Sequence, residues 1–409
     1  MTIDQANSAT IDMTEALAAE AQRRSPRDAA QLLAFSPAAM VADVLQSLNP
    51  AVAQDILDEL PHERRGAILA AASSQQRAQW LRNDRYAEDT IGRLMEPPTA
   101  VFRGTQTIAQ TIETVRELSR TTIVTYAFVV DEVGRLSGVV TMRDLLLSDR
   151  EQRLDSVMLR DPFFLTPAME LPEAMKQVVR RHFPVYPVCE ADGTLIGQVR
   201  GQAMFEEQAY EISAQAGRMV GVDKEERLTT PWTRSLRFRH PWLQLNLLTA
   251  FIAAAVVGTF QGTIDRIVIL AAFLPVLAGQ SGNTGCQALA VALRGMTLGE
   301  LQPGRERALV FKEALLGLFN GALVGVIAAI GMFVTARAQS HPHALLLAFI
   351  VFCSMIGSCI VSGIAGATIP LILRRLGADP ATASSIFLTT ATDVVSMGLF
   401  LSLATAFVR

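Results

Sequence analysis

The stretch ALLLAFIVFCSMIGSCIVSGIAGATIPLIL, residues 344–373, carries no charged side chain. A helix needs about 20 mostly apolar residues to cross the roughly 30 Å of hydrocarbon in a bilayer, so this run is long enough to span one. Four further runs have the same character, the last of them interrupted by one acid, Asp393: 241–264, 267–293, 314–336 and 380–408. Lipid cannot satisfy backbone polar groups, so these segments must be helical. We therefore predict an all-α membrane domain of five transmembrane helices over residues 238–409.

The rest of the chain has a different composition. Residues 1–240 hold 27 Lys+Arg and 33 Asp+Glu, whereas residues 241–409 hold only 9 and 6. The net charge of −3 lacks the bulk positive charge of a nucleic-acid-binding protein, so we expect no nucleic-acid partner. The four cysteines show no C-x-x-C spacing, which predicts neither a disulfide framework nor a zinc site. Acids are spread over residues 1–24 without an apolar core, so we expect no secretory signal there and a cytosolic N-terminal part.

The positive-inside rule gives the orientation. With the N-terminal part cytosolic, five spans place nine basic residues inside: Arg234, Arg237, Arg239, Arg294, Arg305, Arg307, Lys312, Arg374 and Arg375. Only Arg266, Arg337 and Arg409 fall outside. We predict a multi-pass protein of a cell membrane, fitting a bacterial inner membrane, with its C-terminus outside.

Polar residues within the spans carry the functional signal. The second span contains Gly279-Gln280-Ser281-Gly282-Asn283-Thr284-Gly285-Cys286-Gln287 after Pro275. Such a run predicts a broken or tightly packed helix beside a watery path. Packing of small residues explains the glycines equally well, but explains the three amides less easily.

Asp393 lies near the middle of the fifth span, and no span offers a Lys or Arg at comparable depth. Inserting a charged residue there costs about 2.5–3.5 kcal/mol, so a transported cation or proton is the expected counter-ion. A protonated structural Asp is the alternative. One carboxylate is too sparse to dehydrate a small divalent ion, but a two-fold axis would supply a second copy. We therefore predict a homodimer in which two Asp393 side chains hold a largely hydrated Mg²⁺ ion.

The segment 25–90 reads as a stack of short helices, a superhelical N domain that follows a disordered stretch at 1–24. Prolines recur at Pro26, Pro37, Pro50 and Pro61, and Ser36-Pro37 and Asn49-Pro50 resemble a helix cap followed by proline. The acids Asp55, Asp58 and Glu59 read as a solvated face.

An internal repeat follows over 91–208. Residues 134–140 (GRLSGVV) match 193–199 (GTLIGQV) at an offset of 59, and each copy alternates strands with amphipathic helices. This predicts a pair of α/β units. In the first unit Thr141 and Asp144 could hold a ribose, whereas Arg200 and Ala203 occupy those places in the second. A connecting helix is expected over 209–237.

Taken together, these segments resemble the MgtE family of magnesium channels or transporters over about residues 25–409. The resemblance is carried by four groups of residues: Leu274–Leu277 with Gly282–Gly285 and Gln287; Phe311–Glu313; Leu373–Gly377 with Asp379-Pro380; and Thr392–Val394. It implies a multidomain fold: an α-helical superhelical N domain, an α/β pair of tandem CBS domains at 91–208, a plug-like connecting helix and five spans. It also implies a dimer.

The resemblance further implies that Asp393 binds hydrated Mg²⁺ beside Asn283 and the Thr389 carbonyl. Acids of the cytosolic part are implied to bind intracellular Mg²⁺ and close the pore; the regulatory candidates are Glu88, Asp89, Glu211 and Asp223, with Glu225 and Glu226 nearby. Three positions depart from the family pattern, Ile212, Gln261 and Ser385, which implies a weaker gate or another cation.

Two other functions stay open at this stage. The first is a Na⁺- or H⁺-coupled exchanger of divalent cations. The second is a non-conducting membrane sensor whose CBS pair binds ATP or another adenine nucleotide through Thr141 and Asp144. An enzyme is disfavoured, because an intramembrane aspartyl protease needs two acids in different spans and no H-E-x-x-H or G-x-S-x-G motif occurs.

Overall fold

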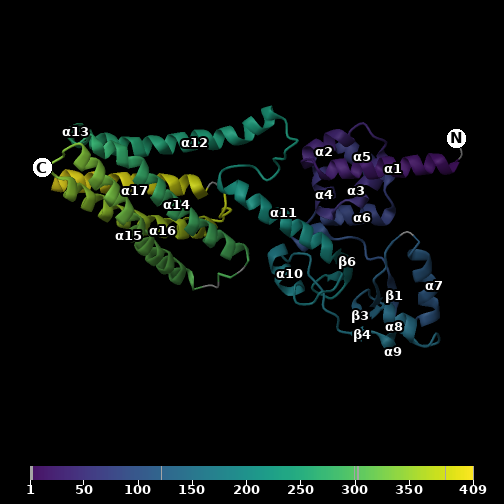
Figure 1. Cartoon of the computed structure of the whole chain (residues 1–409). Helices are drawn as coiled ribbons and strands as arrows, with labels where there is room; N and C mark the ends of the chain where they lie inside the picture. The colour runs from purple at the N-terminus through teal and green to yellow at the C-terminus, as the bar shows by residue number, and fades with distance from the viewer. Residues whose placement is uncertain (1–2, 121, 299, 302–303, 383, 409) are drawn as a thin grey trace. The chain divides into compact units, whose positions relative to one another are not determined.

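The computed structural model describes residues 3–120, 122–298, 300–301, 304–382 and 384–408. They form two compact units (Figure 1). The first runs to Glu211 and includes Arg227–Thr230, and the second comprises Ile212–Glu226 and the chain from Pro231 onward. Arg409, expected on the outer side, lies outside the described residues.

The first unit opens with six helices: α1 (Ile3–Gln22), α2 (Pro26–Leu33), α3 (Ala38–Ser47), α4 (Pro50–Glu59), α5 (His62–Ala71) and α6 (Ser74–Asn83). Asn49 caps α4 as predicted, since its side chain accepts a hydrogen bond from the Ala51 N–H at 3.1 Å. Ser36 does not cap a helix, because Pro37 itself is the N-cap of α3.

The expectation of disorder over 1–24 is wrong for the described residues from Ile3, which form α1. The reason is tertiary packing. Ala21 is 1% exposed, and Leu17 and Ala18 pack against the helical core around Leu45, Leu57 and other apolar residues of α2–α6. These contacts are with residues later in the chain, so they could not be predicted from the sequence of residues 1–24 alone.

Two CBS motifs follow, beginning with η1 (Ile91–Leu94). Their elements are β1 (Val101–Arg103), α7 (Ile108–Leu118), β2 (Tyr126–Val130), β3 (Leu136–Thr141), α8 (Met142–Leu147), α9 (Leu154–Val157), β4 (Leu159–Arg160), α10 (Leu171–Val178), β5 (Val185–Cys189) and β6 (Leu195–Arg200). One sheet has the order β1-β2-β3-β4, with β1 parallel to β2 and the other pairs antiparallel; β5 and β6 form a second, antiparallel sheet.

Each motif lends the segment that precedes it to the sheet of the other. β4, which leads into the second motif, pairs with β3 of the first, and Glu96, which leads into the first, pairs with Gln198 on β6 of the second. A Cβ on Gly138 would lie 2.7 Å from Met158 Cγ, and one on Gly197 would lie 3.2 Å from Met95 Cβ. The repeated glycines therefore admit the exchanged segments.

The hairpins of the two motifs meet at their tips. The Leu136 N–H donates to the Gly193 carbonyl at 2.9 Å, and the Leu195 N–H donates to the Gly134 carbonyl at 3.0 Å. Both glycines have positive φ, 91° and 86°, a conformation that side chains disfavour. The offset of 59 seen in the sequence is thus a pseudo-two-fold relation in space.

The connecting helix differs from the prediction of 209–237. It is α11 (Gly201–Met219), and the next helix starts only at Trp232. The helix ends before Gly221, which has a φ of 78°. The Trp242 side chain lies where a Cβ at this position would be, so only glycine fits. Pro231 then caps the following helix.

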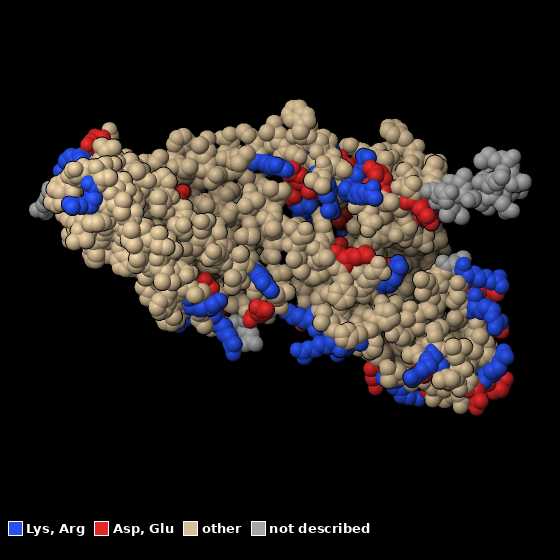
Figure 2. Space-filling view, in the orientation of Figure 1, with Lys and Arg blue, Asp and Glu red and all other residues tan. Residues whose placement is uncertain are grey.

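The second unit consists of α12 (Trp232–Thr259), α13 (Gln261–Arg266), α14 (Ile269–Thr297), α15 (Glu306–Ala338), α16 (Ala344–Arg375) and α17 (Ser384–Phe407). Among the described residues, four helices are long and apolar enough to cross a membrane: α12, α15, α16 and α17. Helix α14, which covers the predicted second span and holds its polar run, is not among these four, so the count of five spans stays a prediction. On the face in Figure 2, the surface of this unit is mostly uncharged.

The predicted multidomain fold class is confirmed, while the helix bounds are shifted. Helix α12 begins nine residues before the predicted 241 because its first turns hold arginines, which end an apolar run without ending a helix. Glycines dominate the contact of α15 with α16: a Cβ on Gly321 would lie 2.9 Å from Ile356 Cα, and one on Gly325 3.2 Å from the Phe352 ring. Such small residues let membrane helices approach closely.

Candidate ion path and cytosolic sites

Asp393 lies within α17, where its side chain is half-buried. In the part of the chain that the structure describes, its carboxylate makes no ion pair. Its backbone carbonyl accepts a hydrogen bond from the Ser396 hydroxyl at 3.3 Å, and the Thr389 carbonyl accepts one from Thr392 at 3.0 Å. Because Thr389 lies inside α17, its carbonyl also accepts the helical hydrogen bond from the Asp393 N–H, and together with the Thr392 hydroxyl this uses both of its lone pairs.

The polar run of α14 packs against α17 at this level. A Cβ on Gly282 would lie 3.9 Å from the Thr392 hydroxyl, and one on Gly285 would lie 2.9 Å from Leu388. Gly285 also faces the Ser362 carbonyl of α16. Helix α14 is continuous from Ile269 to Thr297, so the alternative of a broken helix is wrong. Tight packing accounts for Gly285, whereas the space around Gly279 and Gly282 would admit a Cβ.

The amides of the same run have another role. Gln280, Asn283 and Gln287 recur at helical spacing and are exposed in this chain. They therefore form one polar face of α14, directed away from the packed glycines. Packing alone does not explain an amide face on a helix of a membrane domain.

A row of hydroxyls on α16 was missed by the sequence reading. Ser354, Ser358 and Ser362 are 0–1% exposed, and within the described residues their hydroxyl oxygens have no hydrogen-bond partner. Their spacing of four residues places them on one face of the helix. That spacing was visible in the sequence as a signal.

The regulatory candidates do not form a metal cluster in the described residues, where no group of three or more His, Cys, Asp or Glu is found. Glu88 and Asp89 lie between α6 and η1, and Glu211 lies within α11. Asp223 accepts a hydrogen bond from the Glu225 N–H at 2.9 Å. Glu226 is paired with Arg239, whose Nε donates at 3.0 Å, and this bond lowers the pKa of Glu226.

Asp55 and Asp58 were predicted to lie on a solvated face of the N domain. The structure differs, because both acids contact arginine side chains. Arg93 of η1 is only 7% exposed at its side chain and pairs with Asp58, and it lies 3.5 Å from Asp55. Arg65 pairs with Asp58 and with Asp84, each at 3.1 Å. The Arg93 pairs join the N domain to the segment that enters the CBS pair, whereas the Arg65 pairs lie within the N domain.

Thr141 and Asp144 lie together at the start of α8. The Thr141 hydroxyl donates to Asp144 Oδ2 at 2.7 Å and accepts from the Asp144 N–H at 3.2 Å. This hydroxyl bond lowers the pKa of the Asp144 carboxyl. In the second motif Arg200 instead donates to Glu96 at 2.8 Å.

Comparison with known families accounts for most of the chain. The family model MgtE, divalent cation transporter, matches residues 274–403, and the MgtE intracellular N domain matches 13–89. CBS domains match 91–151 and 154–206. The chain belongs to the MgtE family. It is a multi-pass membrane protein, and the matched membrane region contains Asn283, Thr389 and Asp393.

Curated relatives share this organisation. The magnesium transporter MgtE of Bacillus subtilis (strain 168) is 29% identical over 83% of this chain and 73% of its own length. The magnesium transporter MgtE of Thermus thermophilus is 27% identical over 89% of this chain and 78% of its own. A solved cytosolic domain of the Mg²⁺ channel MgtE in complex with ATP is 25% identical, covers 47% of this chain and 78% of that one, and has a TM-score of 0.42.

Proposed function

We propose that this MgtE-family chain transports Mg²⁺ across a membrane, with the Asp393 carboxylate in the ion path. One observation carries the proposal: in an apolar helix, beside the polar run of α14, lies a half-buried carboxylate that makes no ion pair with any residue the structure describes. A charge in a membrane helix is costly, and such residues mark ion pathways. The names of the relatives, magnesium transporters, support Mg²⁺ as the cargo.

The chemistry of Mg²⁺ suits these residues. The ion is reluctant to lose its water, so it keeps several water molecules and is bound through one or two carboxylates. Asp393 supplies charge, and Asn283 supplies an acceptor for the ion's water. The Thr389 carbonyl accepts from the ion's water when the Thr392 hydroxyl gives up its hydrogen bond to it. The exposed amides at Gln280 and Gln287 extend this polar surface along α14.

The site requires a second copy of the chain. One carboxylate leaves half of the ion's charge uncompensated, and an isologous dimer brings identical residues face to face across its axis. The amide face of α14, exposed in the single chain, supports this arrangement. We place the ion path at the axis of a homodimer in the lipid bilayer, with the N-terminus cytosolic and the C-terminus outside.

Regulation by cytosolic ligands belongs to the same proposal. Glu88, Asp89, Glu211 and Asp223 bind intracellular Mg²⁺ when the cytosolic parts close, and this shifts the population towards a closed pore. ATP or another adenine nucleotide binds the first CBS motif, where Asp144 and Thr141 recognise the ribose. The hydrogen bond from the Thr141 hydroxyl to Asp144 Oδ2 fixes the orientation of the carboxylate, whose remaining lone pairs accept from the ribose hydroxyls.

The test is Mg²⁺ entry into liposomes that contain the purified full chain. Asp393→Asn keeps the shape of the side chain and removes its charge. Two unit charges about 4 Å apart interact by roughly 4 kcal/mol at an effective dielectric constant of 20, and Mg²⁺ carries two charges, so the carboxylate contributes about 8 kcal/mol before solvation is counted. We expect entry to fall at least about 100-fold. Asp265→Asn, the same change at an exposed acid of α13, is the matched control.

If Mg²⁺ entry is unchanged in Asp393→Asn, the assignment of Asp393 to the ion path is wrong. Entry that requires a Na⁺ or pH gradient would instead identify an exchanger. Regulation is tested by adding millimolar Mg²⁺ to the cytosolic face, which should slow Mg²⁺ entry. An unchanged rate of entry would refute the regulatory part of the proposal without affecting the assignment of the ion path.

A further inference from the structure

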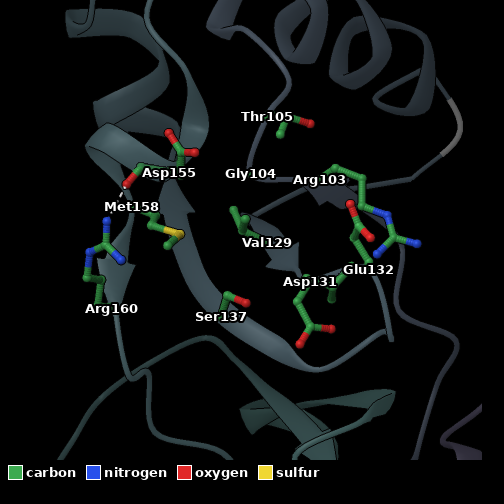
Figure 3. Close-up of a pocket in the computed structure, with 11 residues that line it drawn as sticks. Arg103, Gly104, Thr105, Val129, Asp131, Glu132, Ser137, Asp155, Met158 and Arg160 are labelled. Carbon is green, nitrogen blue, oxygen red and sulfur yellow. Dashed lines mark hydrogen bonds between the residues drawn. The ribbon is translucent and has the colours of Figure 1, made fainter.

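The cavity of the first CBS motif, drawn in Figure 3, has side chains of both charges in its wall. Its volume is about 590 Å³, and five charged residues line it: Asp131, Glu132, Asp155, Arg103 and Arg160. Arg160 donates to the Asp155 carbonyl at 2.9 Å. The charges of this cavity are therefore largely compensated within the chain, unlike those at the start of α12.

The first turns of α12 carry a positive charge that the helix itself does not offset. No acid occurs from Trp232 to Thr259, whereas Arg234, Arg237 and Arg239 do. Arg239 pairs with Glu226 of the preceding loop. Arg237 is exposed, and in the part of the chain that the structure describes it has no acid partner. One cation of this segment is thus available to a ligand.

Arg237 lies on the face of α12 that is turned away from the rest of the second unit. In Figure 1, α12 runs along one edge of this unit. Its packed side includes Ala253, which is 6% exposed, and Val256, whose Cγ1 would lie 3.4 Å from a Cβ on Gly398 of α17. Positions 237 and 253 are 16 residues apart, which is a rotation of about 160° at 3.6 residues per turn. Arg237 therefore faces away from α17.

The acids of the preceding loop lie on the packed side as well. The loop is attached to α12 at both ends, by the contact of Gly221 with Trp242 and by the pairing of Glu226 with Arg239. Arg239 is two positions after Arg237, a rotation of about 200° around the helix axis. The loop acids therefore do not offset the charge of Arg237.

Polar groups accompany Arg237 on its face. His240 and Gln244 are exposed, and Gln244 Nε2 lies 3.2 Å from His240 Nε2. Pro241 has no N–H, so the Arg237 carbonyl lacks the helical hydrogen bond that residue 241 would donate. The face thus offers a cation, a polar pair and a carbonyl acceptor at one level of the helix.

The same face becomes apolar further along the helix. Leu248 and Phe251, four and seven residues after Gln244, are each 63% exposed. Trp232, at the other end of the polar level, is 76% exposed, and tryptophan is enriched at the level of lipid headgroups. We call residues 237, 240, 244, 248 and 251 the outer face of α12. Its order, polar and then apolar, matches a phospholipid read from headgroup to acyl chain.

We propose that the outer face of α12 binds an anionic phospholipid, with Arg237 at the phosphate and an acyl chain along Leu248 and Phe251. The charge selects the lipid, because basic side chains beside a membrane helix attract anionic headgroups. Phosphatidylglycerol fits both groups of Arg237: its phosphate accepts from the guanidinium and its hydroxyls donate to the carbonyl. The leaflet, the cytosolic one, rests on the orientation in the proposed function, whereas the binding itself does not depend on transport.

The experiment measures lipid binding to the purified full chain in detergent by native mass spectrometry. The probes are dioleoylphosphatidylglycerol and dioleoylphosphatidylcholine, which have the same chains. Choline carries a cation and has no hydroxyl, so we expect the first phosphatidylglycerol to bind at least about tenfold more tightly. Glycerol phosphate at equal concentration should not displace it, because this soluble anion has no chain to contact Leu248 and Phe251.

Variants then locate the site. Arg237→Gln keeps a polar side chain and removes the charge, and we expect phosphatidylglycerol to bind about tenfold more weakly. Arg307→Gln is the matched control, since Arg307 is an exposed arginine in the first turn of α15 with Glu306 next to it. This control should bind the lipid as wild type does. Phe251→Ala should weaken the binding of both lipids, because it shortens the apolar part of the outer face.

Equal affinity of the wild-type chain for the two lipids would overturn the proposal, and this comparison holds even where a variant folds poorly. Displacement by glycerol phosphate would identify a site for soluble phosphates instead. Equal weakening in Arg237→Gln and Arg307→Gln would show a general attraction of charge without a site. Disulfide-linked dimers of Leu248→Cys, where wild type forms none, would show that a second copy of the chain covers the outer face, and would also overturn the proposal.

Discussion

Replacing Arg93 by Met tests whether the N domain is fastened to the CBS pair by fixed cations. The substitution keeps an unbranched side chain and removes the charge that faces Asp55, Asp58 and Asp84. Removing one partner of a buried ion pair costs about 3–5 kcal/mol. Arg93 is buried, but its acids are 34–42% exposed and can regain water, so we expect about 2–3 kcal/mol.

That loss should lower the melting temperature of the cytosolic transition by roughly 5–10 °C, given about 2–4 °C per kcal/mol for a domain of this size. The assay is scanning calorimetry of the purified full chain, with hydrogen exchange of α4 and η1 to localise the change. Arg116→Met is the control, because its ion pair with Glu113 is more than half exposed and should matter by under about 0.5 kcal/mol.

Mg²⁺ adds a second readout. Once Arg93 is removed, Asp55, Asp58 and Asp84 lose a shared cation, and Arg65 still pairs with Asp58 and Asp84; divalent ions in solution can screen part of the charge left uncompensated. Added Mg²⁺ should therefore raise the melting temperature of Arg93→Met more than that of wild type. An Arg93→Met chain as stable as wild type without Mg²⁺ would refute the reasoning, since the ion pairs would then contribute nothing.

Two further predictions concern single side chains. Arg239 lowers the pKa of Glu226. The stabilisation by this ion pair is therefore fully present above the ordinary Glu pKa and is lost as the pH falls through the lowered pKa of the folded state. The difference in melting temperature between wild type and Glu226→Gln should be larger at pH 7 than at pH 3, and an equal difference would contradict this prediction. Burial raises the pKa of Cys189 to about 12, so a maleimide should label this thiol at pH 7.5 only after unfolding, whereas rapid labelling of the native chain would refute its burial.

The sequence predicted the membrane part well because its signals are local. An uncharged run long enough to span a bilayer and a lone acid within it are visible without any tertiary contact, and Asp393 stands out on that ground. The polar run of α14 was also visible. Whether it broke the helix depended on neighbours, since Gly285 is matched by Leu388 and Ser362 from helices far along the chain.

The cytosolic part was predicted less completely because its decisive contacts are distant in sequence. Asp58 looks like any exposed helical acid until Arg93, 35 residues later, is placed beside it. Helix α1 depends in the same way on apolar contacts with later helices. The repeat at an offset of 59 predicted two similar motifs, but not that each would lend a segment to the other.

That exchange has a mechanical consequence. The chain leaving the N domain passes through Glu96, which is hydrogen-bonded to β6 of the second motif through Gln198 at 2.8 and 2.9 Å. Strand β6 continues without a loop into α11 at Gly201. A force applied to the N domain is therefore transmitted through these backbone hydrogen bonds to β6. Strand β6 passes it directly to α11, the helix that precedes the membrane domain in the sequence, so the force need not pass through the first motif.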